Sequence, residues 1–248
     1  MRPDLIFLLA ALGFCFGSMA LFGLKYDKAR KDPLESSNRG TFVLGGFVRS
    51  WFFWFVDPAV RLALWARLSP LFFNLAGASF GAAAGVAFGL GKPVWGGWCV
   101  LLGGMADVFD GRVARSQGLA SPKGAFLDSS LDRFAEVGVF AGLAVYFHAQ
   151  PLVSLMVALA LGGSLLVSYT RARGESQGVT CKVGVMQRAE RLLLLGFAGL
   201  LDLSVAGWLG QPAGTLLAWV VTFIAIGTVA TSIYRTIWIA VRLPSNGA

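Results

Sequence analysis

The chain has 248 residues, of which 56% are hydrophobic and only 14% are charged, and its formal net charge is +8. Soluble domains have about 25% charged residues, so the composition predicts an integral membrane protein. The excess of positive charge indicates contact with anionic lipid headgroups or phosphorylated substrates. It does not indicate nucleic acid, because the basic residues lie beside long apolar runs. A single histidine argues against a His-based metal cluster or a Ser-His-Asp triad.

Residues 1–41 are predicted to form a membrane anchor followed by a polar linker. Leu5 to Leu24 is an almost uninterrupted apolar run, long enough to cross a hydrocarbon core of about 30 Å. It lacks a basic region beyond Arg2 and a small-x-small cleavage site, so we expect an uncleaved anchor and not a signal peptide. Several basic residues follow this run directly, which places its C-terminal end in the cytoplasm.

Residues 42–68 interleave tryptophans and phenylalanines with arginines and contain Pro58. Aromatic rings and arginines in alternation are typical of an amphipathic helix that lies along the headgroups. We therefore predict an interfacial amphipathic segment here. A further short membrane span is the alternative.

Residues 69–248 contain six apolar segments with short connections, at 70–90, 93–113, 124–147, 151–171, 189–209 and 213–241. Each is long enough to cross a bilayer as a helix. Small residues are dense within them, which permits close helix packing. The predicted fold is an all-α integral membrane protein, with a six-transmembrane-helix bundle preceded by the anchor and the interfacial helix.

Basic residues are distributed unequally between the two ends of these segments. The connections near 91–93, 148–150 and 203–213 carry Lys92 and no other lysine or arginine, whereas the opposite ends carry many. By the positive-inside rule, the end that bears the arginines faces the cytoplasm. We therefore expect a multi-pass protein of the cell inner (cytoplasmic) membrane, with its active site on the cytoplasmic side.

Four aspartates stand near the facing ends of two of the spans. Asp107 and Asp110 are three residues apart, and Asp128 and Asp132 are four apart, so each pair shares a helix face. Carboxylates at membrane depth are costly and need compensation. Hard carboxylate oxygens suit Mg²⁺ or Mn²⁺, and four of them can hold two such ions, the usual clamp for displacement at phosphorus.

Neighbouring residues fit the same chemistry. Gly111 lets a ligand approach the backbone, and Arg115 offers a fork of donors to a phosphate. One carboxylate is needed as a general base for an attacking hydroxyl. Two alternatives come from other classes: a cation- or proton-coupled transporter, and a structural protein whose acidic cluster joins two helices. Neither explains the glycines or Arg115.

The spacing D-x2-D-G-x2-A-R-x8-G-x3-D-x3-D resembles the signature of the CDP-alcohol phosphotransferases, membrane enzymes of phospholipid synthesis. It is filled by Asp107, Asp110, Gly111, Ala114, Arg115, Gly124, Asp128 and Asp132. The resemblance covers about residues 60–242. It implies six transmembrane helices, a homodimer, two divalent metals (Mg²⁺ or Mn²⁺), and attack of an alcohol on the β-phosphate of a CDP-lipid such as CDP-diacylglycerol, with release of CMP.

The resemblance also implies roles for single residues. The metal ligands would be Asp107, Asp110, Asp128 and Asp132, and Asp132 would also be the base. The CDP moiety would be contacted by Asp107, Gly111, Ala114, Arg115 and Gly124.

The acceptor alcohol must be inferred from residues 168–192. This segment is rich in arginine, which favours an anionic, phosphorylated acceptor. It also looks like the S-Y-x-K-A-R…E-R-x-E-R arrangement of the phosphatidylinositol-phosphate synthases, which implies inositol phosphate bound by Arg171, Arg188 and Arg235, with Arg173 and Arg191 nearby. Arg171 replaces the lysine and Gln187 the first glutamate of that arrangement, so glycerol 3-phosphate, as in phosphatidylglycerol-phosphate synthases, stays open.

Overall fold

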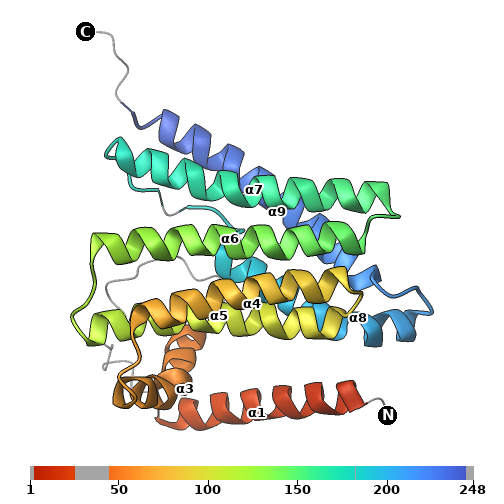
Figure 1. Cartoon of the computed structure of the whole chain (residues 1–248), viewed down its shortest axis with the longest axis horizontal. Helices are drawn as coiled ribbons and strands as arrows, with labels where there is room; N and C mark the ends of the chain where they lie inside the picture. Colours follow the sequence, from red (N-terminus) through yellow and green to blue (C-terminus); the bar gives the residue numbers. More distant parts are fainter. Residues whose placement is uncertain (1–2, 26–44, 182, 244–248) are drawn as a thin grey trace.

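The structure is a computed structural model that describes residues 3–25, 45–181 and 183–243. Within these ranges all regular structure is helical and no strand occurs. The helices in chain order are α1 (Pro3–Lys25), α3 (Gly45–Trp65), α4 (Pro70–Gly89), α5 (Pro93–Ser116), α6 (Pro122–Tyr146), α7 (Pro151–Ser176), α8 (Arg188–Leu209) and α9 (Thr215–Ala240). Figure 1 shows α4 to α9 packed side by side, with α1 and α3 along one flank.

The starts of the helices follow from the local sequence. Five of the described helices, α1 and α4 to α7, begin with a proline, whose fixed φ angle and missing N–H suit the first helical position. Two of these starts are also capped by serine. The Ser69 hydroxyl accepts a hydrogen bond from Phe72 N at 3.2 Å, and the Ser121 hydroxyl accepts one from Gly124 N at 3.1 Å. The turn before α6, on which two of the aspartates depend, is therefore well defined.

Successive connections alternate between the two ends of the bundle (Figure 1). The α5–α6 and α7–α8 connections share one end, so the aspartate stretch and the arginine-rich segment meet there. Helices α4, α7, α8 and α9 are long and apolar enough to cross a membrane. The chain is therefore a helical membrane protein. Helices α5 and α6 have 24 and 25 residues, and they carry the four aspartates.

The helices lie where the apolar segments were predicted, but two continue further toward the aspartate end. The helix α5 extends to Ser116 and α7 to Ser176, beyond the predicted limits of 113 and 171. Backbone hydrogen bonds do not require apolar side chains, so a helix can continue past the apolar stretch. The predicted interfacial segment 42–68 contains α3, and the predicted linker lies outside the described residues.

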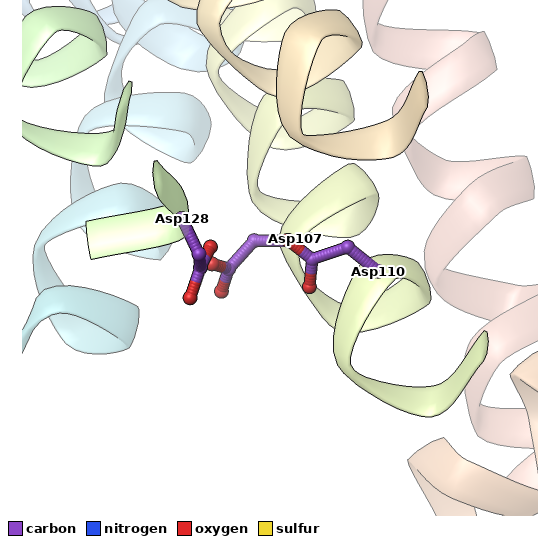
Figure 2. A group of neighbouring side chains, drawn as sticks. All are labelled: Asp107, Asp110 and Asp128. Atoms are coloured by element: carbon purple, nitrogen blue, oxygen red, sulfur yellow. The ribbon is translucent and has the colours of Figure 1, made fainter. Parts of the chain in front are cut away.

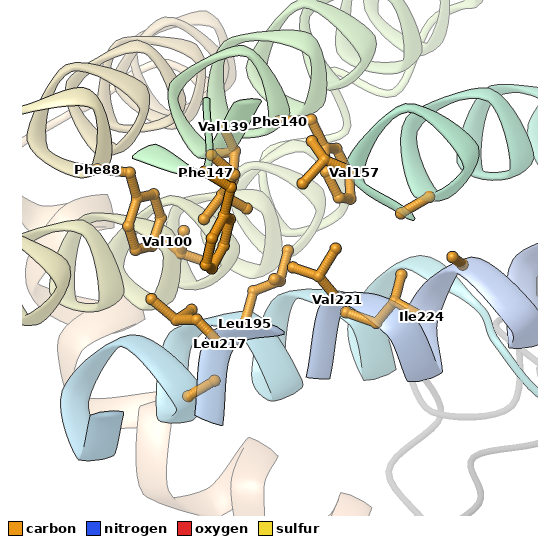
Figure 3. Close-up of a cluster of buried hydrophobic side chains, with 14 of the residues drawn as sticks. Phe88, Val100, Val139, Phe140, Phe147, Val157, Leu195, Leu217, Val221 and Ile224 are labelled. Atoms are coloured by element: carbon orange, nitrogen blue, oxygen red, sulfur yellow. The ribbon is translucent and has the colours of Figure 1, made fainter. Parts of the chain in front are cut away.

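Glycines set how closely the helices approach. A Cβ atom at Gly85 of α4 would overlap the carbonyl of Gly138 in α6, and one at Gly97 of α5 would lie 2.6 Å from Gly196 O in α8. These contacts leave no room for a side chain, as is usual where membrane helices pack through small residues. An apolar core that includes Phe88, Phe140 and Leu195 fills the centre of the bundle (Figure 3).

Candidate active site

Three of the four aspartates converge at the end of the bundle where α5 leads into α6. Asp107 and Asp110 lie one turn apart on α5, and Asp128 lies on the second turn of α6. Each of the three carboxylates has an oxygen within 4.8 Å of an oxygen of the other two. Figure 2 shows these side chains directed toward one another from the two helices. The helix spacing thus produces the predicted acidic cluster.

The chemistry of this cluster fits a divalent cation. Asp110 is only 5% exposed, and its Oδ2 atom is buried with no hydrogen-bond partner among the described residues. Three carboxylates at this distance repel one another in a partly desolvated site. A cation between them removes the repulsion and coordinates the unpaired oxygen. Because all the donors are hard carboxylate oxygens, Mg²⁺ or Mn²⁺ suits the group.

Asp132 is placed differently from the other three. Its Oδ1 atom lies 2.6 Å from Nη2 of Arg188, whose Nη1 lies 2.7 Å from Oδ1 of Asp107. One guanidinium from the start of α8 thereby joins the predicted base to a predicted metal ligand. The resemblance to phosphatidylinositol-phosphate synthases implied that Arg188 belongs to the acceptor pocket, and the sequence gave no indication of this bridge.

A cleft of about 190 Å³ opens beside the aspartate cluster. All four non-acidic residues of the signature line it, together with Asp110 and Asp128; they are Gly111, Ala114, Arg115 and Gly124. A Cβ at Gly111 would lie 3.3 Å from Nη1 of Arg115, so a side chain at this position would crowd the guanidinium. Asp107 is also predicted to contact the CDP moiety; its Oδ1 atom pairs with Arg188, and it is not among the described residues that line this cleft.

The cleft also contains a residue that the sequence interpretation missed. Asn74 of α4 lines it, and its side-chain oxygen is buried without a hydrogen-bond partner among the described residues. A lone asparagine in a predicted membrane span is a signal in itself, because an amide there needs a polar partner. Pro70 and Ser121, at the starts of α4 and α6, line the same cleft.

Two of the predicted acceptor arginines are buried and already engaged. Arg191 is 1% exposed; it pairs with Glu136 of α6 and donates to Met186 O at 3.2 Å. Arg235 of α9 is 4% exposed, and it donates to the backbone oxygens of Val183 at 2.7 Å and Val167 at 2.8 Å. Arg235 thereby holds the segment before α8 against α7. The Nε atom of Arg191 is buried and has no hydrogen-bond partner among the described residues.

Besides Arg188, the remaining two arginines of the predicted set of five lie at the surface, near the end of α7. Arg171 pairs with Glu175 through a contact of 2.9 Å, and Arg173 is exposed. Arg171 and Arg191 are nonetheless near enough to repel the guanidinium of Arg235 electrostatically. The charges of Arg171, Arg191 and Arg235 therefore act on one another, with Glu175 and Glu136 as acidic partners of the first two, while Arg188 joins the aspartates. Lys182 lies outside the described residues.

Comparison with known proteins agrees with this geometry. Residues 72–231 match the family model described as CDP-alcohol phosphatidyltransferase. The chain is 34% identical over 208 residues to a phosphatidylinositol phosphate synthase of Streptomyces avermitilis, covering 80% of this chain and 83% of the relative. It is 36% identical over 190 residues to an archaetidylinositol phosphate synthase of Methanothermobacter thermautotrophicus, covering 76% of this chain and 90% of the relative.

Solved structures extend the similarity to the fold. The crystal structure of the Mycobacterium tuberculosis phosphatidylinositol phosphate synthase with CDP-DAG bound superposes with a TM-score of 0.64 at 26% identity, covering 73% of this chain and 92% of that one. The structure of the same enzyme with manganese and citrate also gives a TM-score of 0.64, at 27% identity and with coverage of 73% and 88%. The signature, the cleft and these matches together show that the chain belongs to the CDP-alcohol phosphatidyltransferase family.

Proposed function

We propose that this membrane enzyme transfers the phosphatidyl group of a CDP-lipid, CDP-diacylglycerol, to a hydroxyl of inositol phosphate and releases CMP. The observation that carries the proposal is the single cleft in which the signature residues meet the aspartate cluster. Family membership favours an enzyme over the transporter and over the purely structural alternative.

We assign the CDP moiety to this cleft, where Gly111 and Gly124 leave space and Arg115 supplies donors for phosphate. Asn74 offers an amide for hydrogen bonding to the same ligand. The relative with CDP-DAG bound supports this choice of donor.

Asp107, Asp110 and Asp128 would hold the first of two divalent cations, and Asp132 would help to hold the second. When bound, such cations neutralise a pyrophosphate and polarise the phosphorus that is attacked. The relative that contains manganese supports the metal dependence.

In the proposed step, Asp132 accepts the proton of the acceptor hydroxyl. Arg188 engages Oδ1 of Asp132, so we assign the proton to the other oxygen. The hydroxyl oxygen forms a bond to the β-phosphorus of the CDP-lipid, the bond from that phosphorus to the bridging oxygen breaks, and CMP leaves with the electron pair.

The acceptor site is proposed to be the positive region of Arg171, Arg191 and Arg235, with Arg188 between this region and the aspartates. A phosphate there would add an anionic partner to like charges that Glu175 and Glu136 balance only in part. Arg173 is exposed and would act only through the local potential. The names of the relatives support inositol phosphate as the acceptor.

The membrane placement belongs to the same proposal. We propose that α4 to α9 all span the inner membrane, with the aspartate end in the cytoplasm, and that α1 is an anchor. The proposed units are 1–41, 42–68 and 69–248. Basic residues at the cytoplasmic end would contact anionic lipids, and the enzyme would act as a homodimer.

The test is an acceptor panel with purified enzyme, CDP-diacylglycerol and Mn²⁺ or Mg²⁺, in which the lipid product is identified by mass. We expect phosphatidylinositol phosphate and stoichiometric CMP with inositol phosphate, and no turnover after the metal is chelated. If phosphatidylglycerol phosphate is the main product, the acceptor is glycerol 3-phosphate and not inositol phosphate. No CMP with any acceptor would refute the transfer reaction.

A further inference from the structure

The last two turns of α5 present two different faces. One face, with Gly111, Ala114 and Arg115, lines the cleft. Arg112 and Val113, between them in sequence, are buried, and Val113 packs with Val60 and Ala63 of α3. The helix end that carries half of the signature is therefore enclosed between the cleft and α3.

Arg112 connects these two helices by three contacts on one turn of α3. Its Nη1 atom donates to Phe53 O at 2.9 Å, its Nη2 atom lies 2.9 Å from Oδ1 of Asp57, and its guanidinium carbon lies 5.3 Å from the centre of the Phe53 ring. Pro58 follows Asp57 within the same helix and has no N–H to donate to the preceding turn. The missing N–H of Pro58 concerns the carbonyl of Trp54; the guanidinium itself is held by the Phe53 carbonyl, the Phe53 ring and the Asp57 carboxylate.

Arg112 is the buried partner of the pair and Asp57 is the more exposed one, so the two residues do not respond equally when the pair is broken. The side chain of Arg112 is 9% exposed and that of Asp57 is 31% exposed. Asp57 keeps Arg61 when Arg112 is removed, whereas the charge of Arg112 remains without its ion-pair partner in a desolvated position when Asp57 is removed. The end of α5 would then shift or rotate to return Arg112 to solvent. Asp110 and Arg115 are two and three residues away and would move with it.

We propose that the Asp57–Arg112 pair is a positioning contact for the CDP-lipid site, through which α3 holds the end of α5 in the geometry that the donor substrate requires. The proposal rests on the proposed function, because it assumes that the cleft binds CDP-lipid. It gives a role to a helix that lies outside the family match at residues 72–231. Arg112 belongs to α5 and Asp57 to α3, and neither is among the described residues that line the cleft. They would therefore act through Asp110, Gly111 and Arg115.

The test compares Asp57→Asn, Arg112→Gln and the double variant in lipid nanodiscs with Mn²⁺. Direct binding of CDP-diacylglycerol is measured by calorimetry, alongside the KM values for both substrates and the thermal unfolding temperature. We expect each single variant to weaken CDP-diacylglycerol binding about tenfold and the double variant to be no worse, as for residues that act through one contact. The KM for the acceptor should change less, and Arg112→Lys should restore part of the affinity.

Arg61→Ala is the matched control. Arg61 binds the other oxygen of the same carboxylate at 2.8 Å, but it belongs to α3 and is 80% exposed. Its loss should leave CDP-diacylglycerol binding unchanged. Variants that bind the donor as tightly as the wild type, or that lose only thermal stability, would overturn the positioning role. If the wild type binds CDP-diacylglycerol but releases no CMP, the transfer reaction is refuted. The positioning role is still tested, because the affinities of the variants and the wild type for CDP-diacylglycerol can be compared.

Discussion

The acidic and the basic halves of the site are built in opposite ways. Asp107, Asp110 and Asp128 come from one continuous stretch, and helix periodicity together with the short α5–α6 turn brings their oxygens together. The arginines come from three helices that meet only through long-range packing. The acidic half holds an unpaired oxygen, whereas Arg191 and Arg235 are engaged by protein oxygens. We infer that the aspartates, placed by local geometry, determine the type of reaction. The arginines, placed by helix packing, can differ between enzymes that use different acceptors.

The largest expected effect lies in the acidic half. We predict that Asp110→Asn lowers the rate of CMP release by about 100- to 1000-fold, on the scale of losing a central electrostatic element of catalysis. Because one of three repelling carboxylates becomes neutral, thermal stability should not fall. Activity and thermal unfolding are measured together.

The control for this prediction is Asp202→Asn. Asp202 is a fully buried aspartate of α8 that accepts hydrogen bonds from Gly214 N at 2.6 Å and Leu217 N at 3.1 Å at the start of α9. Its replacement should lower the unfolding temperature and leave Mn²⁺ affinity intact. The same pattern in both variants would show that Asp110 has only a structural role.

The helix seam beneath the acidic half is expected to be the most sensitive packing contact. Gly85→Ala should destabilise the protein by about 3 kcal/mol or more, because the methyl group would overlap α6 where the backbones touch. Thermal unfolding in detergent measures the loss. Gly162→Ala in α7, where the new methyl group would meet no described atom within 4 Å apart from its neighbours and the backbone of its own helix, should be neutral or slightly stabilising. Equal effects would mean that α4 and α6 are not in this close contact.

The basic half should affect the acceptor rather than the donor. We predict that Arg235→Ala raises the KM for inositol phosphate roughly 10- to 100-fold, the value of a charge-assisted hydrogen bond, with little change in the KM for the CDP-lipid. Arg242→Ala is the control, since Arg242 lies after the end of α9 and contacts Trp238. A similar rise in both KM values would show that Arg235 only supports the fold.

The smallest effect is expected at the exposed edge of the basic half. Arg171→Ala should raise the KM for inositol phosphate only about threefold, because an exposed pair such as Arg171–Glu175 contributes little and is screened by salt. The KM is compared at low and high salt. A loss as large as that of Arg235→Ala would show that Arg171 contacts the acceptor phosphate directly.

The sequence predicted the acidic half more completely than the basic half, for physical reasons. The positions of Asp107, Asp110 and Asp128 depend on helix periodicity and one short turn, and both are visible in the spacing. The bridge from Arg188 to Asp107 and Asp132 depends on how α8 packs against α5 and α6, and no local pattern encodes that contact.

The same limit applies to the fold. Apolar runs predicted the helices, but the ends of α5 and α7 lay beyond them, because charged residues can continue a helix without continuing the apolar pattern. Asn74 was missed since its role depends on the α4–α5–α6 arrangement. The contact between Arg112 and the Pro58 turn of α3 likewise required the packed structure.

The most direct test of the division between the two halves is a crystal structure with Mn²⁺, CDP-diacylglycerol and inositol phosphate, with manganese located by anomalous scattering. We predict manganese peaks within coordination distance of Asp107, Asp110 and Asp128, and the acceptor phosphate against Arg235 and Arg191. Manganese away from these carboxylates, or the acceptor phosphate bound outside the arginine region, would contradict the account.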